Sequence, residues 1–172
     1  MIIKKRQQGF TMLEMIITVG ILSIGILGIY GAFSPLVEKN YVTTLQFKAT
    51  YLAQEGFEIV RNIRDNNVEK GRFWSSGLSD CASGCQADYK TETTAALPVN
   101  YLNNYRDEFL KLNADGFYSY DRNGNESVYK RKITITQPSG SDMLKVLVEV
   151  FWNYNNQSYR VENVGYLYRF NR

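Results

Sequence analysis

A run of 23 residues without a charged side chain, from Met15 to Val37, constrains this chain more than any other feature of its sequence. About 20 apolar residues are enough for an α-helix to cross the hydrocarbon core of a bilayer, so the run predicts a transmembrane helix. A secretory signal usually has a shorter apolar core that ends in a small-residue cleavage site of the A-x-A kind. Nothing like that site follows Val37, and we therefore expect an N-terminal membrane anchor.

The formal charges are distributed unevenly along the chain. There are 20 Lys and Arg residues against 17 Asp and Glu residues, and three of the basic ones are Lys4, Lys5 and Arg6. Residues 1–9 hold no acid, so the chain from Phe10 onward is neutral. By the positive-inside rule, the basic cluster should keep the N-terminus in the cytoplasm and the remainder beyond the membrane. A neutral body also argues against a nucleic-acid partner, because such binding normally requires a basic patch.

The composition narrows the classes of function. The chain has no histidine, which excludes Ser-His-Asp hydrolysis, Cys-His proteases and the commoner zinc sites. An apolar fraction of 44%, with 14% aromatic residues, can form a folded core. We expect a folded domain beyond the membrane that needs no cofactor.

A single carboxylate, Glu14, lies just inside the apolar stretch that begins at Phe10. Burying such a charge in a bilayer costs roughly 2.5–3.5 kcal/mol on insertion scales, so a carboxylate at this position usually has a partner or a function. Gly9 directly precedes Phe10, and the basic cluster lies a few residues before Gly9.

The string KKRQQG-FTMLEMIITVGIL resembles the class III leader of type IV prepilins and type II secretion pseudopilins. The resemblance implies that a membrane prepilin peptidase cuts between Gly9 and Phe10 and that the new N-terminus, Phe10, is methylated. It also implies that Glu14 is the glutamate on which subunit assembly depends. The partners implied are the prepilin peptidase and methylase, other pilin or pseudopilin subunits, the inner-membrane assembly platform and membrane lipid.

The chemistry of these residues agrees with that reading. Cleavage after Gly9 would create a positively charged amine on Phe10 in an apolar environment. The Glu14 carboxylate of the same or an adjacent subunit can neutralise this amine, whereas leaving either charge unpaired would cost several kcal/mol. Removing residues 1–9 also removes the basic anchor that resists extraction from the membrane.

Apolar residues recur every three or four positions beyond the membrane segment, which predicts an amphipathic helix. We expect one long helix from about Phe10 to about Arg64, bent at Pro35 because proline removes a backbone donor. The stretch LAQEGFEIVRNIRD also resembles the stem of minor pilins of the PilV and GspI type. The predicted organisation is a leader at 1–9, a transmembrane helix at 10–37, an amphipathic stem at 38–64 and a globular head at 65–172.

The head is expected to begin with a loop-rich region that reaches about Asn104 and to continue as antiparallel strands. The pair Asn123-Gly124 is a strong signal for a type I′ hairpin turn, and Tyr154–Gln157 should form a second turn. The fold class is therefore α+β, with a long N-terminal helix packed on a sheet of four or five antiparallel strands, as in type IV pilin heads. The predicted strands are Phe109–Asn113, Phe117–Arg122, Ser127–Thr136, Met143–Asn153 and Ser158–Phe170.

Cys81 and Cys85 are the only cysteines. In a chain exported across a membrane they can form a disulfide, which would contribute roughly 2 kcal/mol for so short a loop. Two alternatives are a pair of free thiols and a metal site completed by Asp80 and Asp88. We expect the disulfide, and no metal.

Three other segments have a possible function and a simpler structural explanation. Residues 121–126 offer oxygen ligands for calcium, but their spacing does not match an EF-hand loop and a hairpin turn explains them. The basic run 130–132 could contact DNA, but strand alternation places Arg131 on the opposite face from its neighbours and a solvated strand face is expected. Two carboxylate pairs could serve an enzyme, although solvated surfaces commonly carry such pairs: Glu55 with Glu58, and Asp107 with Glu108.

The sequence therefore predicts a structural subunit, a minor pilin or pseudopilin, with no catalytic activity. It would sit in the cytoplasmic membrane as a single-pass protein and then enter an extracellular or periplasmic filament. The alternative is a single-pass anchored protein that binds a ligand outside the membrane and never assembles; its N-terminus would remain Met1.

Overall fold

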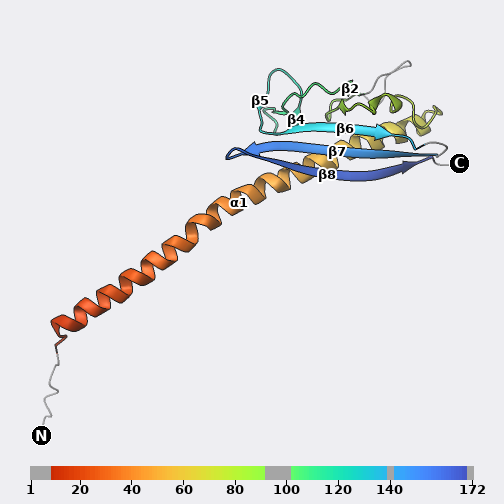
Figure 1. The fold of residues 1–172 in the computed structure, drawn as a ribbon. Coiled ribbons are helices and arrows are strands. Elements are labelled where there is room, and N and C mark those ends of the chain that lie inside the picture. The colour runs from red at the N-terminus through yellow and green to blue at the C-terminus, as the bar shows by residue number, and fades with distance from the viewer. Residues whose placement is uncertain (1–8, 92–101, 139–141, 170–172) are drawn as a thin grey trace, which may run out of the picture. The chain divides into compact units, whose positions relative to one another are not determined.

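A computed structural model describes residues 9–91, 102–138 and 142–169, except for the side chains of residues 34, 35 and 80. The basic residues 4–6, and Phe170 at the end of the last predicted strand, therefore lie outside the described residues. The chain separates into two compact units, Met1–Thr43 and Thr44–Arg172, which are described in turn. One helix, α1 (Met12–Glu69), contributes to both units (Figure 1).

The first unit is formed by the N-terminal part of α1. Side chains 10–33 and 36–41 are all exposed, and the most apolar window of the helix has a mean hydropathy of 2.2. By length and composition this helix can cross a membrane. Two of its hydroxyl groups bond within the helix: Thr18 Oγ1 donates to the Glu14 carbonyl at 2.6 Å, and Ser23 Oγ donates to the Val19 carbonyl at 2.7 Å. The helix continues through position 35, and the bend at Pro35 stays a prediction.

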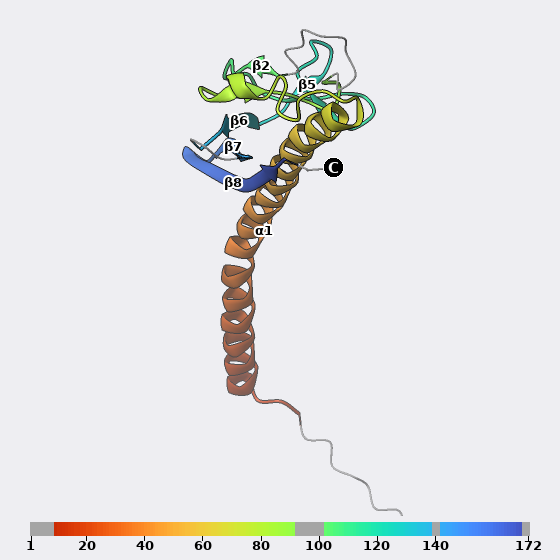
Figure 2. The ribbon, with the colours of Figure 1, turned by 90° about the vertical axis from the view of Figure 1, so that its right-hand side faces the viewer.

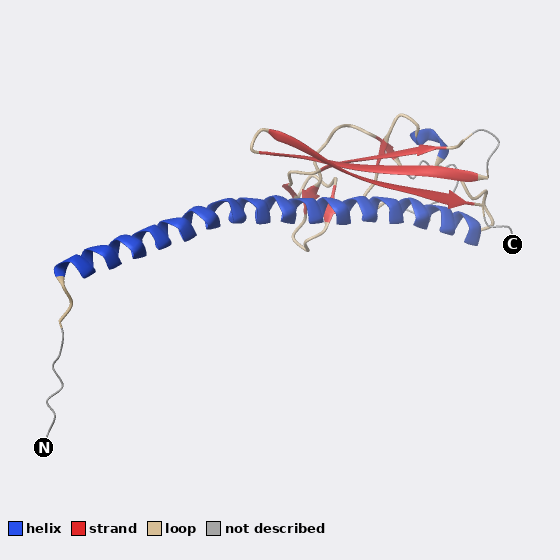
Figure 3. Ribbon diagram, turned by 60° about the horizontal axis from the view of Figure 1, so that its bottom comes forward, coloured by secondary structure: helices blue, strands red, loops and turns tan. Residues whose placement is uncertain are grey.

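In the second unit, α1 from residue 44 onward packs against a sheet (Figures 2 and 3). The predicted end of the helix near Arg64 is wrong, because α1 continues to Glu69. Asn67 is buried rather than exposed, and its side-chain amide donates to the Ser76 carbonyl at 2.9 Å. Gly71, two residues after the end of α1, has a φ of 65°. There the Arg72 amide donates to the Asn67 carbonyl at 2.8 Å and the Gly71 amide to the Val68 carbonyl at 3.1 Å, which is a Schellman motif.

The main sheet has five strands in the order β2-β1-β6-β7-β8, and every neighbouring pair is antiparallel. Their bounds are β1 (Cys85–Gln86), β2 (Asn103–Asn104), β6 (Lys130–Thr136), β7 (Met143–Tyr154) and β8 (Gln157–Tyr168). The turn between β7 and β8 was predicted correctly. Asn155 and Asn156 there have φ values of 48° and 59°, as a type I′ turn requires.

A second, three-stranded sheet has the order β4-β3-β5, with β3 (Lys111–Leu112), β4 (Tyr118–Ser119) and β5 (Asn125–Glu126). The predicted strands Phe109–Asn113 and Phe117–Arg122 are thus reduced to two residues each and do not join the main sheet. The hairpin prediction at Asn123-Gly124 is also wrong, because β4 and β5 both pair with β3 and not with each other. An added Cβ at Gly124 would lie 2.8 Å from Lys111 Cβ, so this glycine allows a close approach of the chain to β3.

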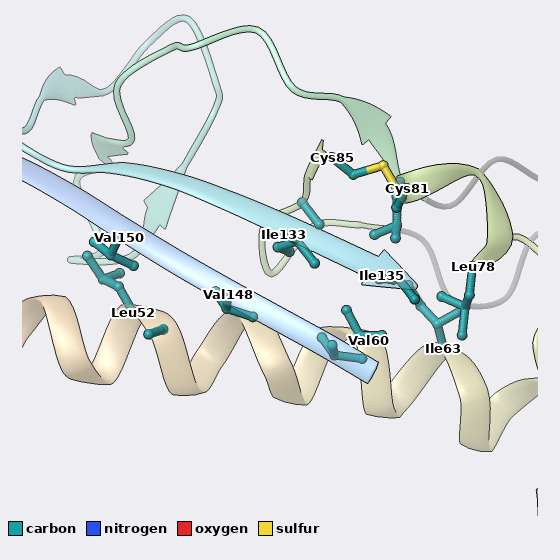
Figure 4. Close-up of a cluster of buried hydrophobic side chains, with 14 of the residues drawn as sticks. Leu52, Val60, Ile63, Leu78, Cys81, Cys85, Ile133, Ile135, Val148 and Val150 are labelled. Carbon is teal, nitrogen blue, oxygen red and sulfur yellow. A yellow bond between two sulfur atoms is a disulfide. The ribbon is translucent and has the colours of Figure 1, made fainter. Parts of the chain in front are cut away.

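The core lies between α1 and one face of the main sheet (Figure 4). Alternate residues of β7 are buried there, and the helix contributes its small and aliphatic side chains. The members from these two elements include Ala49, Leu52, Ala53, Val60 and Ile63 of α1, and Leu144, Val146, Val148, Val150 and Trp152 of β7. The α+β fold, with a long helix on antiparallel strands, is confirmed.

The strand residue Arg131 corrects the prediction of a solvated basic face. Its side chain is fully buried on the helix-facing side of β6. The guanidinium donates to the Leu52 carbonyl at 3.0 Å and to the Ala87 carbonyl at 2.5 Å, and lies 3.4 Å from Glu55 Oε2. An added Cβ at Gly56 would lie 3.1 Å from Arg131 Cδ, so the glycine leaves room for this side chain. Arg131 therefore links α1, the residue that follows β1, and β6 within the core.

Candidate processing and assembly site

The peptide bond between Gly9 and Phe10 lies in exposed, non-helical backbone immediately before α1. Residues 9–11 have no regular secondary structure, and nothing lies within 4 Å of the position that a Gly9 Cβ would occupy. A protease needs an extended and accessible backbone, and an exposed terminal segment supplies one. The geometry at the predicted cleavage site is therefore compatible with proteolysis.

Thr11 caps the N-terminus of α1. Its Oγ1 accepts a hydrogen bond from the Glu14 amide at 3.3 Å, and its carbonyl accepts one from the Met15 amide at 3.2 Å. This is the Thr half of a capping box, in which a Thr at the cap precedes a Glu by three positions. The sequence pattern Thr11-x-x-Glu14 contained this signal, which the sequence analysis missed.

The side chain of Glu14 is free within this cap. Among the described residues its carboxylate makes no hydrogen bond and no ion pair, and the residue is exposed. A carboxylate in the first turn of a helix is favoured by the helix dipole, by about 0.3–1 kcal/mol in water. Its neighbours along the helix are exposed apolar side chains of the segment that can cross a membrane, so Glu14 is a free carboxylate within an apolar segment.

The predicted cysteine pair lies in the second unit, far along the sequence from Glu14. Cys81 ends the short helix η1 (Ser79–Cys81) and Cys85 begins β1, and their sulfur atoms are bonded to each other (Figure 4). Both cysteines are buried in the core. Cys85 pairs with Asn104 of β2 on one side and Ile133 of β6 on the other, so the bond ties η1 to an interior strand of the sheet.

The carboxylate pairs considered for an enzyme do not form a shared site. Glu58 pairs with Arg61 at 3.1 Å on the exposed face of α1, while Glu55 pairs with buried Arg131. Each member of the pair Asp107 and Glu108 also has its own partner: Lys130 Nζ lies 2.7 Å from Asp107, and Gln86 donates to Glu108 at 3.4 Å.

The environment of Asp107 favours its charged form. The hydrogen bond from Lys130, followed by one from the Tyr105 hydroxyl at 2.7 Å, lowers the pKa of the Asp107 carboxyl. Burial, with a smaller contribution from Asp107, raises the pKa of Tyr105. A carboxylate held ionised in this way is a poor proton donor, so the cluster acts as an ion pair that ties the 105–109 segment to β6.

The segments considered for ion binding show other contacts. Asp121 pairs with Lys90, and the Tyr120 amide donates to Asp88 at 2.9 Å. Across residues 9–91, 102–138 and 142–169, no group of three or more His, Cys, Asp or Glu side chains is placed to hold a metal ion.

Comparison with known proteins identifies the N-terminal segment. Residues 4–30 match the family model of the prokaryotic N-terminal methylation motif. The match contains Gly9, Phe10 and Glu14, and the chain therefore carries a leader of the type IV prepilin and pseudopilin kind. Searches of the curated proteins and of the solved structures each gave no match.

Proposed function

We propose that this chain is a structural subunit, a minor pilin or pseudopilin, of a type IV pilus-like or type II secretion-like filament. The methylation motif supports a pilin-type or pseudopilin-type subunit. The observation that carries the proposal is the arrangement of residues 9–14: an exposed Gly9–Phe10 bond, a capped apolar helix and a free carboxylate on Glu14. The leader is cleaved after Gly9 and Phe10 is methylated.

Assembly follows from the charge that cleavage creates. The Phe10 amine is positive and lies four residues before Glu14, whose carboxylate has no partner among the described residues. In an apolar medium the two groups stabilise each other, and either one alone costs several kcal/mol. Pairing between the amine of one subunit and Glu14 of the next allows the apolar helix to leave lipid and enter a filament core. The partners are the peptidase and methylase, neighbouring subunits and the assembly platform of the cytoplasmic membrane.

The first test is the N-terminal peptide of the membrane-extracted protein, measured by mass spectrometry from cells with the native peptidase. A peptide that begins at Phe10 and is heavier by one methyl group supports processing by this pathway. A peptide that begins at Met1 would overturn the filament proposal and favour the anchored binding protein.

The second test separates assembly from processing. Glu14→Ala should leave membrane insertion and cleavage intact and reduce the amount of the chain in sheared filaments at least several-fold, because the amine then lacks its partner. Thr11→Val is the matched control: it removes the helix cap, at about 1 kcal/mol, and keeps the carboxylate. Normal incorporation of Glu14→Ala would contradict the proposed role, as would an equal loss in both variants.

A further inference from the structure

A groove of about 480 Å³ lies between α1 and the β3–β4 region of the second unit. Its centre is apolar and is formed by Tyr51, Leu52, Phe117 and Tyr118, whereas Lys48 and Glu55 lie on the α1 wall on either side of that centre. Tyr51 is 69% exposed and Phe117 is 56% exposed, although both are large apolar side chains. An apolar centre with charges at its border is the composition of a protein–protein interface.

Phe117 is held in its exposed position by a rigid turn. Asn113 Oδ1 accepts hydrogen bonds from the amides of Asp115 at 3.0 Å and Phe117 at 2.8 Å. The same Asn113 donates through Nδ2 to the Tyr89 hydroxyl at 2.9 Å, and the rings of Tyr89 and Phe117 lie 5.2 Å apart. An exposed aromatic side chain that is already immobilised loses little entropy when a partner covers it.

The charges of the groove have a defined order along α1. Lys48 and Glu55 are two helical turns apart and so share a face, with the base nearer the N-terminal end and the acid roughly 10 Å further on. Glu55 is shared with Arg131, and Lys48 has no ion pair among the described residues. The α1 wall of the groove thus has a base, then apolar side chains, then an acid.

The outer face of β7 and β8, on the other side of the sheet from α1, has the same three features in the reverse order. Three cross-strand pairs form it: Lys145 with Tyr166, Leu147 with Val164, and Glu149 with Glu162. Val164 and Tyr166 are about half exposed. Arg160 bonds to both Glu149 and Glu162, which leaves one net negative charge on β7 and β8 at the glutamate end of the face. Lys132 of the neighbouring strand β6 lies beside Glu149, and its ammonium is 5.6 Å from the Tyr105 ring. Lys145 lies roughly 13 Å away along the strand.

The direction of β7 decides how the two surfaces can meet. An added Cβ at Gly56 would lie 2.9 Å from Val148, and Val150 lies beside Leu52 (Figure 4), so β7 runs opposite to α1. The acidic end of the β7–β8 face is therefore nearer the N-terminal end of α1, and Lys145 is nearer its C-terminal end. In the groove the order is the opposite, because Lys48 is nearer the N-terminal end of α1 than Glu55 is. Two copies that point the same way consequently bring Lys48 to the glutamates of the other copy and Lys145 to Glu55, so that each lysine meets a carboxylate.

We propose that the groove of one copy receives the outer β7–β8 face of a second copy, with both copies in the same sense. Tyr166 and Val164 fill the apolar centre, Lys48 meets the glutamate end, and Glu55 meets Lys145. Such a contact is heterologous, because it joins two different surfaces, and heterologous contacts that do not close generate open helical filaments. The inference rests on the proposed function and names the partner of the head as a second copy of this chain.

The contact also sets an axial displacement. Glu149 lies between Val148 and Val150, at the level of about residue 54 of α1, and must meet Lys48 of the other copy, six residues earlier. At 1.5 Å per residue, the second copy is displaced by roughly 9 Å toward the N-terminal end of α1.

Cysteine cross-linking in intact filaments tests the contact. The doubly substituted chain, Tyr51→Cys with Tyr166→Cys, treated with a short bismaleimide, should give a ladder of dimers, trimers and longer products. Each single variant alone should give none, and a mixture of the two should give dimers only. Phe73→Cys with Tyr166→Cys is the matched control, because Phe73 is similarly exposed and lies outside both surfaces; it should give no ladder. The native Cys81 and Cys85 are bonded and buried and should not react.

Charge exchange provides a second arm. Lys48→Glu should reduce the cross-linking yield of the double-cysteine chain several-fold, and adding Glu162→Lys should restore it. Sheared filaments that contain the processed chain but show no ladder would overturn the contact and leave the proposed function standing. Dimers from a single variant, or a product with a protein of another size, would also overturn it. Absence of the chain from filaments would instead contradict the proposed function.

Discussion

Replacing Arg131 by methionine should lower the free energy of unfolding of the second unit by about 3 kcal/mol. Methionine retains much of the aliphatic volume and removes the guanidinium, which is fully buried and donates to two carbonyl groups. The Ala87 carbonyl loses this donor, at a cost of roughly 1–3 kcal/mol for a buried group. The Leu52 carbonyl keeps its helical partner, so losing its bond from Arg131 costs less, about 1 kcal/mol.

Two further features limit the size of the effect. Glu55, which also loses its partner, has a side chain that is 34% exposed and can be hydrated. The wild-type protein already bears the cost of Arg131 Nε, which is buried without a hydrogen-bond partner, and methionine removes that cost. The net value should thus fall at the lower end of the 3–5 kcal/mol that breaking a buried ion pair usually costs.

The measurement is urea unfolding of the full chain in detergent micelles, followed by the fluorescence of Trp74 and Trp152, which are both buried in the second unit. Lys132→Met is the matched control on the same strand: its ammonium lies over the Tyr105 ring at 5.6 Å, and its loss should cost less than about 1 kcal/mol. Glu55→Gln should cost about as little, because the pair is partly exposed. An Arg131→Met protein within about 1 kcal/mol of wild type would refute the reasoning.

Two other predictions concern the head. Replacing both Cys81 and Cys85 by serine should lower the free energy of unfolding by roughly 2 kcal/mol, the loop entropy of so short a ring, measured by the same fluorescence assay with reduced wild-type protein for comparison. The ion pair between Asp107 and Lys130 should be sensitive to acid, because folding lowers the pKa of the Asp107 carboxyl. Its contribution to the free energy of unfolding is fully present above the unfolded-state pKa of about 4. That contribution is lost as the pH falls through the lower pKa of the folded state. Asp107→Asn should flatten the pH dependence of stability below about pH 4, and an unchanged slope would show that this carboxylate is not coupled to folding.

The parts of the fold that were predicted correctly are the long elements. The helix and the strands β6, β7 and β8 each present enough residues for a periodic pattern to be read. By contrast, β1 and β2 have two residues each, and they form because Cys85 and Gln86 meet partners 19 and 17 positions later in the chain. No local sequence pattern predicts pairing between residues so far apart in the chain, and both strands were therefore expected to be part of a loop.

The two turn signals show why a local motif can mislead. Asn123-Gly124 looked like the stronger hairpin signal, yet neither residue has a positive φ, and the glycine serves a close approach to Lys111 and Leu112. The turn with the type I′ conformation is Asn155-Asn156, where two long strands with clear alternation flank it. Asparagine tolerates the left-handed region without a glycine, and the register of the strands decides which turn forms.

The prediction placed Arg131 on the correct side of its strand, but it wrongly expected a solvated side chain where the structure has a buried one. Alternation separated it from Lys130 and Lys132, but it shares its face with Ile133 and Ile135, and that face is the core. The missed signal was this grouping of a base with two isoleucines. The second half of the arrangement, Gly56 on α1, could not be connected to Arg131 from sequence because the two positions lie 75 residues apart.

At the N-terminus, the structure separates two roles that the sequence pattern combined. The helix cap uses the Thr11 hydroxyl and the Glu14 backbone amide, and any residue except proline supplies that amide. The Glu14 carboxylate is therefore not required for the cap, where its interaction with the helix dipole adds at most about 1 kcal/mol. This gain is smaller than the cost of placing a carboxylate within a bilayer, which is roughly 2.5–3.5 kcal/mol. Local helix stability cannot explain why an acid occupies this position in an apolar segment. A positive partner from outside the helix can, and cleavage after Gly9 would produce one on Phe10.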